Sequence, residues 1–304
     1  MSELDLLVLG DCNPDLVLAG DVEPSFGQAE RVVDDAELTI GGSAAILACG
    51  AARLGLRAAV ASVVGSDALG RFMLDALTQR GVDVSGVVVR AEARTGVTVV
   101  LVRGSDRAML TALGTINELT AELVDPKLLL AARHVHVSSY FLQDALRPGL
   151  AGLLRLARGA GATTSVDPNW DPRQEWDGGL LDILGETTIL FVNAEEAKRI
   201  AGVGDEETAA HALSRNRAVL VVVKLGRDGA LAVADGRVVH SPPIAVAEVD
   251  AVGAGDSFDA GFLAGHLAGR ALEESLRLAN ACGAFSMRAA GGTAAQPTLE
   301  EAST

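Results

Sequence analysis

The sequence predicts an α/β fold in which a mainly parallel, doubly wound sheet forms a three-layer α/β/α core with a small β-sheet beside it. Three patterns support this prediction. Short β-branched runs alternate with longer segments of helical periodicity. The runs are almost continuously apolar, as in strands that are buried on both faces of a parallel sheet. Two further stretches have strand character but no helix within them, which predicts the small sheet.

The predicted core strands, in chain order, are LDLLVLG (4–10), AAVASVVG (58–65), HVHVSS (134–139), TTSVD (163–167), TILFVN (188–193) and AVLVVVKLG (218–226). Apolar spacing and terminal glycines predict crossover helices between them. These helices are SAAILACGAARLG (43–55), ALGRFMLDALTQRG (68–81), DALRPGLAGLLRLARGAG (144–161), NAEEAKRIAG (193–202) and EETAAHALSRN (206–216). The alternation indicates one large domain covering residues 1–304.

The small sheet is expected from residues 15–40 and 95–113, where turn residues separate strand-like runs. The last segment, GGTAAQPTLEEAST (291–304), is the one stretch expected to fray.

Composition excludes several classes of function. The net charge of −15 and the absence of a Lys/Arg cluster argue against nucleic-acid binding. Three widely spaced cysteines, without a C-x-x-C pair, indicate neither a disulfide framework nor a zinc site, so we expect a reducing, cytoplasmic compartment. The N-terminal apolar run is too short for a signal peptide, and no later stretch is long enough to predict a membrane segment.

The absence of certain motifs narrows the chemistry. There is no G-x-x-x-x-G-K-[ST] phosphate loop, and no G-x-G-x-x-G follows the first strand. The sequence GDSFD lacks the final glycine of a nucleophile elbow. The hydrolase and dehydrogenase interpretations are therefore weakened.

The stretch DAVGAGDSFDAGFLAG (250–265) has the composition of an anion site. Gly253, Ala254 and Gly255 precede Asp256 at a predicted helix start, where exposed amides carry partial positive charge. We expect those amides to keep Asp256 ionised, so that it can accept a proton from an attacking hydroxyl. The alternative is that Asp256 is only an N-cap after a tight turn.

This stretch resembles the second signature of the ribokinase-like (PfkB) carbohydrate kinase family, and GGSAAILACGAARLG (41–55) resembles the first. DPNWDPR, NAEEAK and VVVKLGRDGAL are similar to further motifs of that family, in the same order along the chain. The resemblance implies ATP-dependent phosphorylation of a hydroxyl on a sugar, polyol or nucleoside, with the small sheet acting as a lid. It also implies Asp256 as the base and the amides of residues 253–256 as the anion hole.

On the nucleotide side, the resemblance implies that Asn193 and Glu196 organise Mg²⁺; a capping box is their structural alternative. Asp167 and Asn169 are expected to line the phosphate side together with Arg173, for which pairing with a surface acid is the alternative. Lys224, Gly226 and Asn280 are expected near ATP, although Lys224 is also explained as an exposed strand-end cation. Asp250 matches an acid that holds potassium in many relatives, but Val252 replaces the usual Thr.

On the acceptor side, Asn13 and Asp15 match a pair that hydrogen-bonds substrate hydroxyls, with an Asx turn as the alternative. Gly41 and Gly42 are expected to let the backbone approach the substrate. Arg107 is a candidate for binding an anionic substituent, or a solvated strand residue. Ile46 stands where many sugar kinases have Asn, which predicts a more apolar pocket.

A sugar or polyol kinase is the leading hypothesis. Alternatives are a nucleoside kinase, which the 3% aromatic content disfavours, and a non-catalytic sensor. A homodimer formed through the lid sheets, as in relatives, is also expected.

Overall fold

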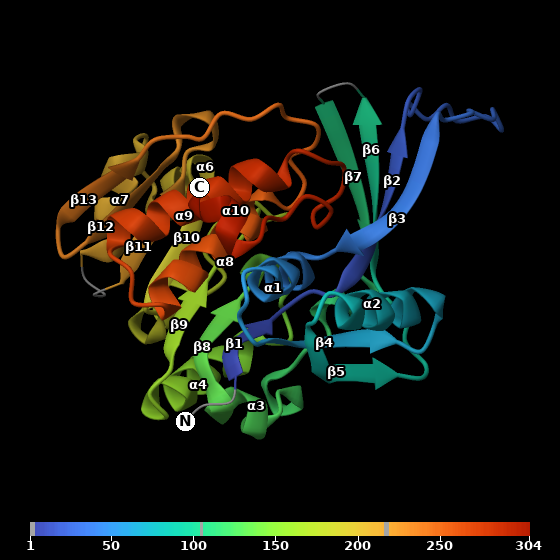
Figure 1. The fold of residues 1–304 in the computed structure, drawn as a ribbon. Helices are drawn as coiled ribbons and strands as arrows, with labels where there is room; N and C mark the ends of the chain where they lie inside the picture. The colour runs from blue at the N-terminus through green and yellow to red at the C-terminus, as the bar shows by residue number, and fades with distance from the viewer. Residues whose placement is uncertain (1–3, 104–105, 216–218) are drawn as a thin grey trace.

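The computed structural model describes residues 4–103, 106–215 and 219–304; parts of the predicted segments at 104–105 and 216–218 lie outside the described residues. Within these ranges, a nine-stranded sheet has the order β13-β12-β11-β10-β9-β8-β1-β4-β5 (Figure 1). Its strands are β1 (Leu4–Leu9), β4 (Ala58–Gly65), β5 (Asp83–Arg90), β8 (Ala132–Val137), β9 (Thr163–Val166), β10 (Ile189–Asn193), β11 (Leu220–Lys224), β12 (Ala230–Ala234) and β13 (Arg237–Ser241). All neighbours from β11 through β5 pair in parallel.

Helices cover both faces of this sheet, because successive strand residues are buried on opposite sides. Leu7 and Leu9 of β1 belong to one core cluster, whereas Leu6 and Val8 belong to the other. The first cluster includes α3 (Pro126–Ala131), α4 (Arg147–Gly159), α5 (Leu180–Ile183), α6 (Ala194–Ala201) and α7 (Glu206–Ser214). The second includes α1 (Ser43–Arg53), α2 (Ala68–Gln79), α8 (Ala254–Leu267), α9 (Leu272–Ser286) and α10 (Leu299–Ser303). The predicted three-layer core is confirmed.

A four-stranded sheet, in the order β3-β2-β6-β7, projects from one end of this body (Figure 1). It consists of β2 (Asn13–Ala19), β3 (Asp35–Gly41), β6 (Val97–Arg103) and β7 (Asp106–Ala112). Thr39, Asp15, Thr98 and Thr111 lie opposite one another across the four strands and form a polar row on one face. Leu38, Leu16, Val99 and Leu110 form the matching row on the other face, which is apolar. The predicted fold class, including the smaller sheet, is therefore confirmed.

The C-terminal segment is ordered, so the expectation of fraying at 291–304 is wrong. The Gln296 side chain is buried, and its Nε2 donates to Ile46 O at 2.9 Å and to Ser257 Oγ at 3.0 Å. Arg80, which follows α2, donates to Thr293 O at 2.7 Å. The segment thus ties α1, α2 and the start of α8 together.

Short 3₁₀ turns complete the described elements: η1 (Gly114–Asn117), η2 (Ala121–Leu123), η3 (Tyr140–Leu142), η4 (Leu184–Glu186) and η5 (Gly226–Asp228). No helix in the described part of the chain has the length and apolar character needed to cross a bilayer.

Candidate active site

The site forms at the carboxyl edge of the nine-stranded sheet. The chain builds outward from β1 in both directions, through β4 to β5 and through β8 to β11. A crevice opens beyond the strand ends where a sheet reverses direction in this way, and ligands bind there. Asn13 and Asp167 follow β1 and β9, and Asn193 and Lys224 are the last residues of β10 and β11, so the fold brings these separate motifs to one edge.

A glycine, Gly253, occupies the N-cap position of α8. Gly253 has φ 69° and is packed so tightly that an added Cβ would lie 2.8 Å from Gly292 Cα and 2.9 Å from Ile46 Cγ2. The Ala254 amide donates to Ala251 O at 3.3 Å. Among the described residues, the amides of Gly255 and Asp256 have no such acceptor and remain available to an anion.

Ile46, which stands where many sugar kinases have Asn, is buried. Its side chain is 3% exposed and packs against Gly253 and Gly292, beside the turn that precedes α8. The expectation that Ile46 makes the acceptor pocket more apolar stays a prediction, because Gly253, which Ile46 contacts, lies three residues before Asp256. Ile46 supports the turn that precedes α8.

Asp256 is buried at the start of α8, and burial together with the nearby charge of Asp167 raises its pKa to about 8. Lys224 and a hydrogen bond with Ser43 oppose this shift without cancelling it. The expectation that the helix amides keep Asp256 ionised is therefore wrong for the free protein, because desolvation and like charge outweigh them. A carboxyl group with this pKa can accept a proton near neutral pH.

Lys224 lies among buried acids and is not an exposed strand-end cation. Its Nζ is 2.5 Å from Asp167 Oδ2 and 3.3 Å from both carboxylate oxygens of Asp259. Although burial favours the neutral amine, the Asp167 and Asp259 charges hold the Lys224 pKa above its ordinary value. A Cβ on Gly255 would lie 3.4 Å from Nζ, which places the ammonium beside the first turn of α8.

Asn193 and Glu196 form the capping box that was the structural alternative. Glu196 Oε2 accepts from the Asn193 amide at 2.8 Å, and Asn193 Oδ1 accepts from the Glu196 amide at 2.9 Å. Burial and the Asp167 charge raise the Glu196 pKa to about 7. Glu196 Oε2 accepts the hydrogen bond of the cap, so the other carboxylate oxygen, which lies near the Asp167 charge, remains for a cation.

These oxygens fit Mg²⁺ that is bound largely through water and phosphate. No group of three or more acidic, His or Cys side chains in the described ranges is arranged as a direct metal cage. Mg²⁺ commonly keeps several waters and takes only one or two protein carboxylates together with substrate phosphates. The chemistry of Asn193 and Glu196 matches that mode.

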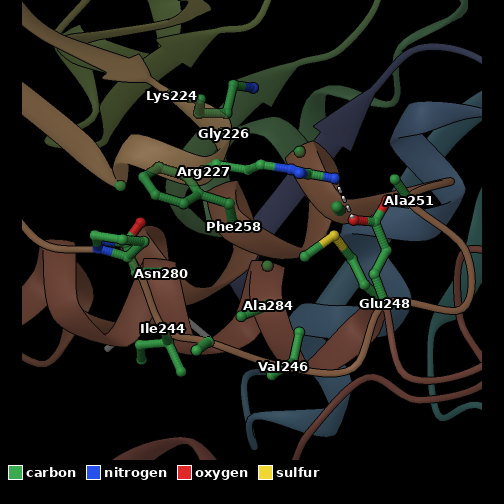
Figure 2. Close-up of a pocket in the computed structure, with 17 residues that line it drawn as sticks. Lys224, Gly226, Arg227, Ile244, Val246, Glu248, Ala251, Phe258, Asn280 and Ala284 are labelled. Atoms are coloured by element: carbon green, nitrogen blue, oxygen red, sulfur yellow. Dashed lines mark ion pairs between the residues drawn. The ribbon is translucent and has the colours of Figure 1, made fainter.

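A cavity of about 710 Å³ opens beside the start of α8 (Figure 2). Lys224, Gly226 and Asn280, which the sequence predicts near ATP, line it together with Ala254 and Gly255. Its remaining wall includes apolar side chains that sequence reasoning missed, among them Ile244, Val246, Phe258, Ala284 and Met287. Arg227 and Glu248 face each other across it, 3.7 Å apart. Its size and mixed lining suit a small-molecule ligand.

Asn280 shapes this cavity through the chain that follows β13. Its Nδ2 donates to Ser241 Oγ at 3.0 Å and to Pro242 O at 2.9 Å. These bonds hold the segment before Ile244 against α9. Asn280 therefore positions the apolar wall.

The acceptor candidates lie where β2 begins. Asn13 Nδ2 is 3.4 Å from Thr98 Oγ1, and burial with the charges of Asp11 and Asp250 raises the Asp15 pKa to about 7. Gly41 permits this arrangement, because a Cβ there would lie 2.0 Å from Asp15 Oδ1. Gly42 is the N-cap position of α1. The charge of Asp11 raises the pKa of both Asp15 and Asp256, so Asp11 lies near both acids.

Asp250 connects the turn that precedes α8 to the small sheet. Its Oδ1 accepts from Val252 N at 2.9 Å, and its Oδ2 accepts from Gly291 N at 2.9 Å. Arg107 Nη1 on β7 lies 3.6 Å from Oδ1, so Arg107 is an exposed strand residue, as one alternative predicted, that also forms an ion pair. Both Asp250 oxygens are thus engaged by the protein, which does not favour a potassium site.

In the DPNWDPR segment (167–173), the first residues lie at the site, whereas the last lies at the surface. Asp167 Oδ1 accepts from the Asn169 amide, and Asn169 Nδ2 donates to Ser43 Oγ at 2.8 Å. Arg173 instead pairs with Asp144 Oδ2 at 2.6 Å and is half-exposed, so pairing with a surface acid is its observed role.

Sequence reasoning missed Asp11, Ser43, Asp259 and Gln296. Asp11 accepts from the amides of Ser43 and Ala44 and fixes the start of α1 beside β1. Its place in the GDCNPD stretch that follows β1 was the available signal. Asp259 follows Asp256 by three residues and therefore shares its helix face, which was a second signal.

Comparisons with known proteins agree with this geometry. The family model described as pfkB family carbohydrate kinase matches residues 3–299. An ATP-dependent ribose-1-phosphate kinase from Halopiger xanaduensis is 32% identical over 97% of this chain and 95% of its own. A fructokinase from Klebsiella pneumoniae is 33% identical over 86% of this chain and 90% of its own.

Among solved structures, a putative ribokinase II from E. coli in complex with ATP and Mg²⁺ superposes with a TM-score of 0.86. It is 24% identical, and the match covers 98% of this chain and 97% of that one. That likeness concerns the fold. Because the family model covers nearly the whole sequence, the chain belongs to the pfkB family of carbohydrate kinases.

Proposed function

We propose that this protein transfers the γ-phosphoryl group of ATP to a hydroxyl of a sugar or polyol. One observation supports the proposal: Ala254 and Gly255 at the start of α8 line the nucleotide-sized cavity, and Asp256, the next residue, is close enough to Asp11 to be affected by its charge, as Asp15 is. Phosphoryl transfer depends mainly on positioning and on stabilising charge, and this arrangement supplies both.

Each residue has a step in this reaction. Asp256 accepts the proton from the acceptor hydroxyl, whose oxygen forms the new bond to the γ-phosphorus while the bond to ADP breaks. The Gly255 and Asp256 amides donate to the oxygens of the transferring group. Lys224 supplies positive charge beside the same turn. Asn280 and the apolar wall of the cavity position the adenine of ATP.

Asn193 and Glu196 would hold Mg²⁺ together with waters and the ATP phosphates. The ion would neutralise phosphate charge and orient the γ-phosphoryl group. The capping box fixes both side chains for this task at the end of β10.

Asp15 and Asn13 would bind acceptor hydroxyls, since a carboxylate and a carboxamide together accept and donate. Asp11, Asp15, Asp250 and Asp256 make this cleft acidic. Arg107, the one cation of β7 that reaches it, is already paired with Asp250. A neutral polyol or sugar therefore suits the cleft better than an anionic acceptor.

We also propose that the protein is a cytoplasmic homodimer. The apolar outer row of the small sheet exposes Leu38 and Leu110, with 62% of Leu110 exposed, which favours burial against a second copy. The three cysteines are free and buried, in keeping with a reducing compartment.

An ATP-consumption screen tests the proposed function. Purified protein would be incubated with Mg-ATP and single sugars, polyols, phosphosugars or nucleosides, and the product identified by ³¹P NMR. A phosphomonoester formed from a neutral sugar or polyol is the expected result. Phosphorylation of nucleosides alone, or of no acceptor in a broad panel, would contradict it.

A further inference from the structure

We propose that Asp259 is a positioning residue that holds the Lys224 ammonium beside the first turn of α8, where the phosphoryl group is transferred. The proposal rests on the proposed kinase function, and it concerns a residue of the 250–265 stretch to which the family resemblance gave no role. It starts from one contact: both Asp259 oxygens lie 3.3 Å from Lys224 Nζ.

Asp259 lies too deep to act on a substrate. It is 0% exposed, one helical turn after Asp256 and on the same side of α8. Asp256 lies one turn nearer the start of α8, where Ala254 and Gly255 line the cavity. A role for Asp259 must therefore act through a neighbour, and Lys224 is the cation that it contacts.

Lys224 needs such an anchor. A lysine side chain has several freely rotating bonds, and Lys224 extends from the last residue of β11 into a cavity wide enough for a nucleotide. Asp167 contacts the ammonium through Oδ2 while its Oδ1 accepts from the Asn169 amide. Asp259 contacts it from α8, so two separate elements restrict the ammonium. With two contacts in place, little side-chain freedom remains to be lost when phosphate binds.

The position that results is useful for transfer. Nζ lies within van der Waals range of where a Gly255 Cβ would be, close to the amides available to an anion. An ammonium held there adds positive charge to the same anion site without reorganisation during the reaction. An unanchored ammonium would spend part of its time in solvent.

The lysine content of the chain permits a direct test that needs neither ATP nor acceptor. The sequence contains three lysines, Lys127, Lys198 and Lys224. Lys127 lies in an exposed position, and the Lys198 side chain is 29% exposed against 14% for Lys224. Acetylation by a small anhydride, followed by peptide mass mapping, therefore reports on Lys224 with two internal controls.

The variant Asp259→Leu fills a similar volume but removes both oxygens, and Asp259→Asn retains one. In Asp259→Leu we expect Lys224 acetylation to become at least about tenfold faster, with Lys127 and Lys198 unchanged, and kcat to fall at least about tenfold with a small change in the acceptor KM. Asp259→Asn should recover part of both effects. Asp75→Asn, an exposed acid on α2, is the matched control and should behave as wild type.

A double-mutant cycle with Lys224→Met completes the experiment. If Asp259 acts through Lys224, adding Asp259→Leu to Lys224→Met should lower kcat no further. Wild-type protection of Lys224 in Asp259→Leu, or additive losses in the cycle, would overturn the proposal. If Asp259→Leu does not fold, Asp259→Ala replaces it in the same measurements. An enzyme that phosphorylates no acceptor would contradict the proposed function, while the acetylation result would still decide the placement of Lys224.

Discussion

At the start of α8, burial beside Asp167 gives the Asp256 carboxyl a pKa of about 8. A general base works in its deprotonated form, and a raised acid pKa leaves that form scarce below the pKa. We therefore expect kcat/KM for the acceptor to increase with pH and to level off above about pH 8. Initial rates from pH 6 to 9.5, with Mg-ATP saturating, measure this. A flat profile across that range would show that Asp256 is not titrating in catalysis.

Asp15 is the residue on which the acceptor side depends. A hydrogen bond to a charged group contributes about 1.5–3 kcal/mol, so Asp15→Ala should raise the acceptor KM by at least about tenfold. The KM for ATP should change little, because Asp15 lies on β2 and does not line the nucleotide cavity. Equal losses for both substrates, or none, would identify Asp15 as a structural turn residue.

The sequence allowed most of these residues to be found but not their electrostatic state. Asp256, Asp15 and Lys224 each lie at or just after a recognisable strand end or helix start. Their pKa shifts depend on neighbours far along the chain, such as Asp167 beside Asp256, which only the fold brings together. Ile46 illustrates the same limit, because its contact with Gly292 joins two ends of the chain.

At the scale of elements, the junction of β10 and α6 combines a helix cap with a proposed metal site. Glu196→Gln keeps an oxygen for the Asn193 amide, so the cap and the stability of α6 should survive. The loss of charge should raise the Mg²⁺ concentration for half-maximal activity by about tenfold or more. Rates measured across an Mg²⁺ titration at fixed ATP test this. An unchanged Mg²⁺ requirement accompanied by a lower Tm would leave Glu196 as a cap alone.

Elements with strong local signals were predicted well, and those without were missed. The runs at 58–65 and 188–193 match β4 and β10 closely. The β12–β13 hairpin was overlooked although Asp235 and Gly236, a common turn pair, separate its strands. The sequence of 291–304 resembles a loop, because hydrogen bonds to residues distant in the chain, including Ser257 and Arg80, fix its position.

For the whole molecule, the outer face of the small sheet makes the proposed dimer testable. Leu110→Glu places a charge within the apolar row of Leu38, Leu16 and Val99, and burying that charge is costly. We expect the variant to sediment as a monomer where the wild type is a dimer. Val89→Glu, on the exposed side of β5 and outside this row, is the matched control. A monomeric wild type, or a dimer that survives Leu110→Glu, would contradict an interface on this face.

The central claim is that Asp256 takes the acceptor proton while the phosphoryl group passes the start of α8. Asp256→Asn keeps the shape of the side chain but removes its basicity. The measurement is kcat with the best acceptor from the screen, together with the Kd for ATP from calorimetry. We expect kcat to fall by about 10² to 10⁴ with little change in the Kd for ATP. A variant that turns over at close to the wild-type rate would contradict the account.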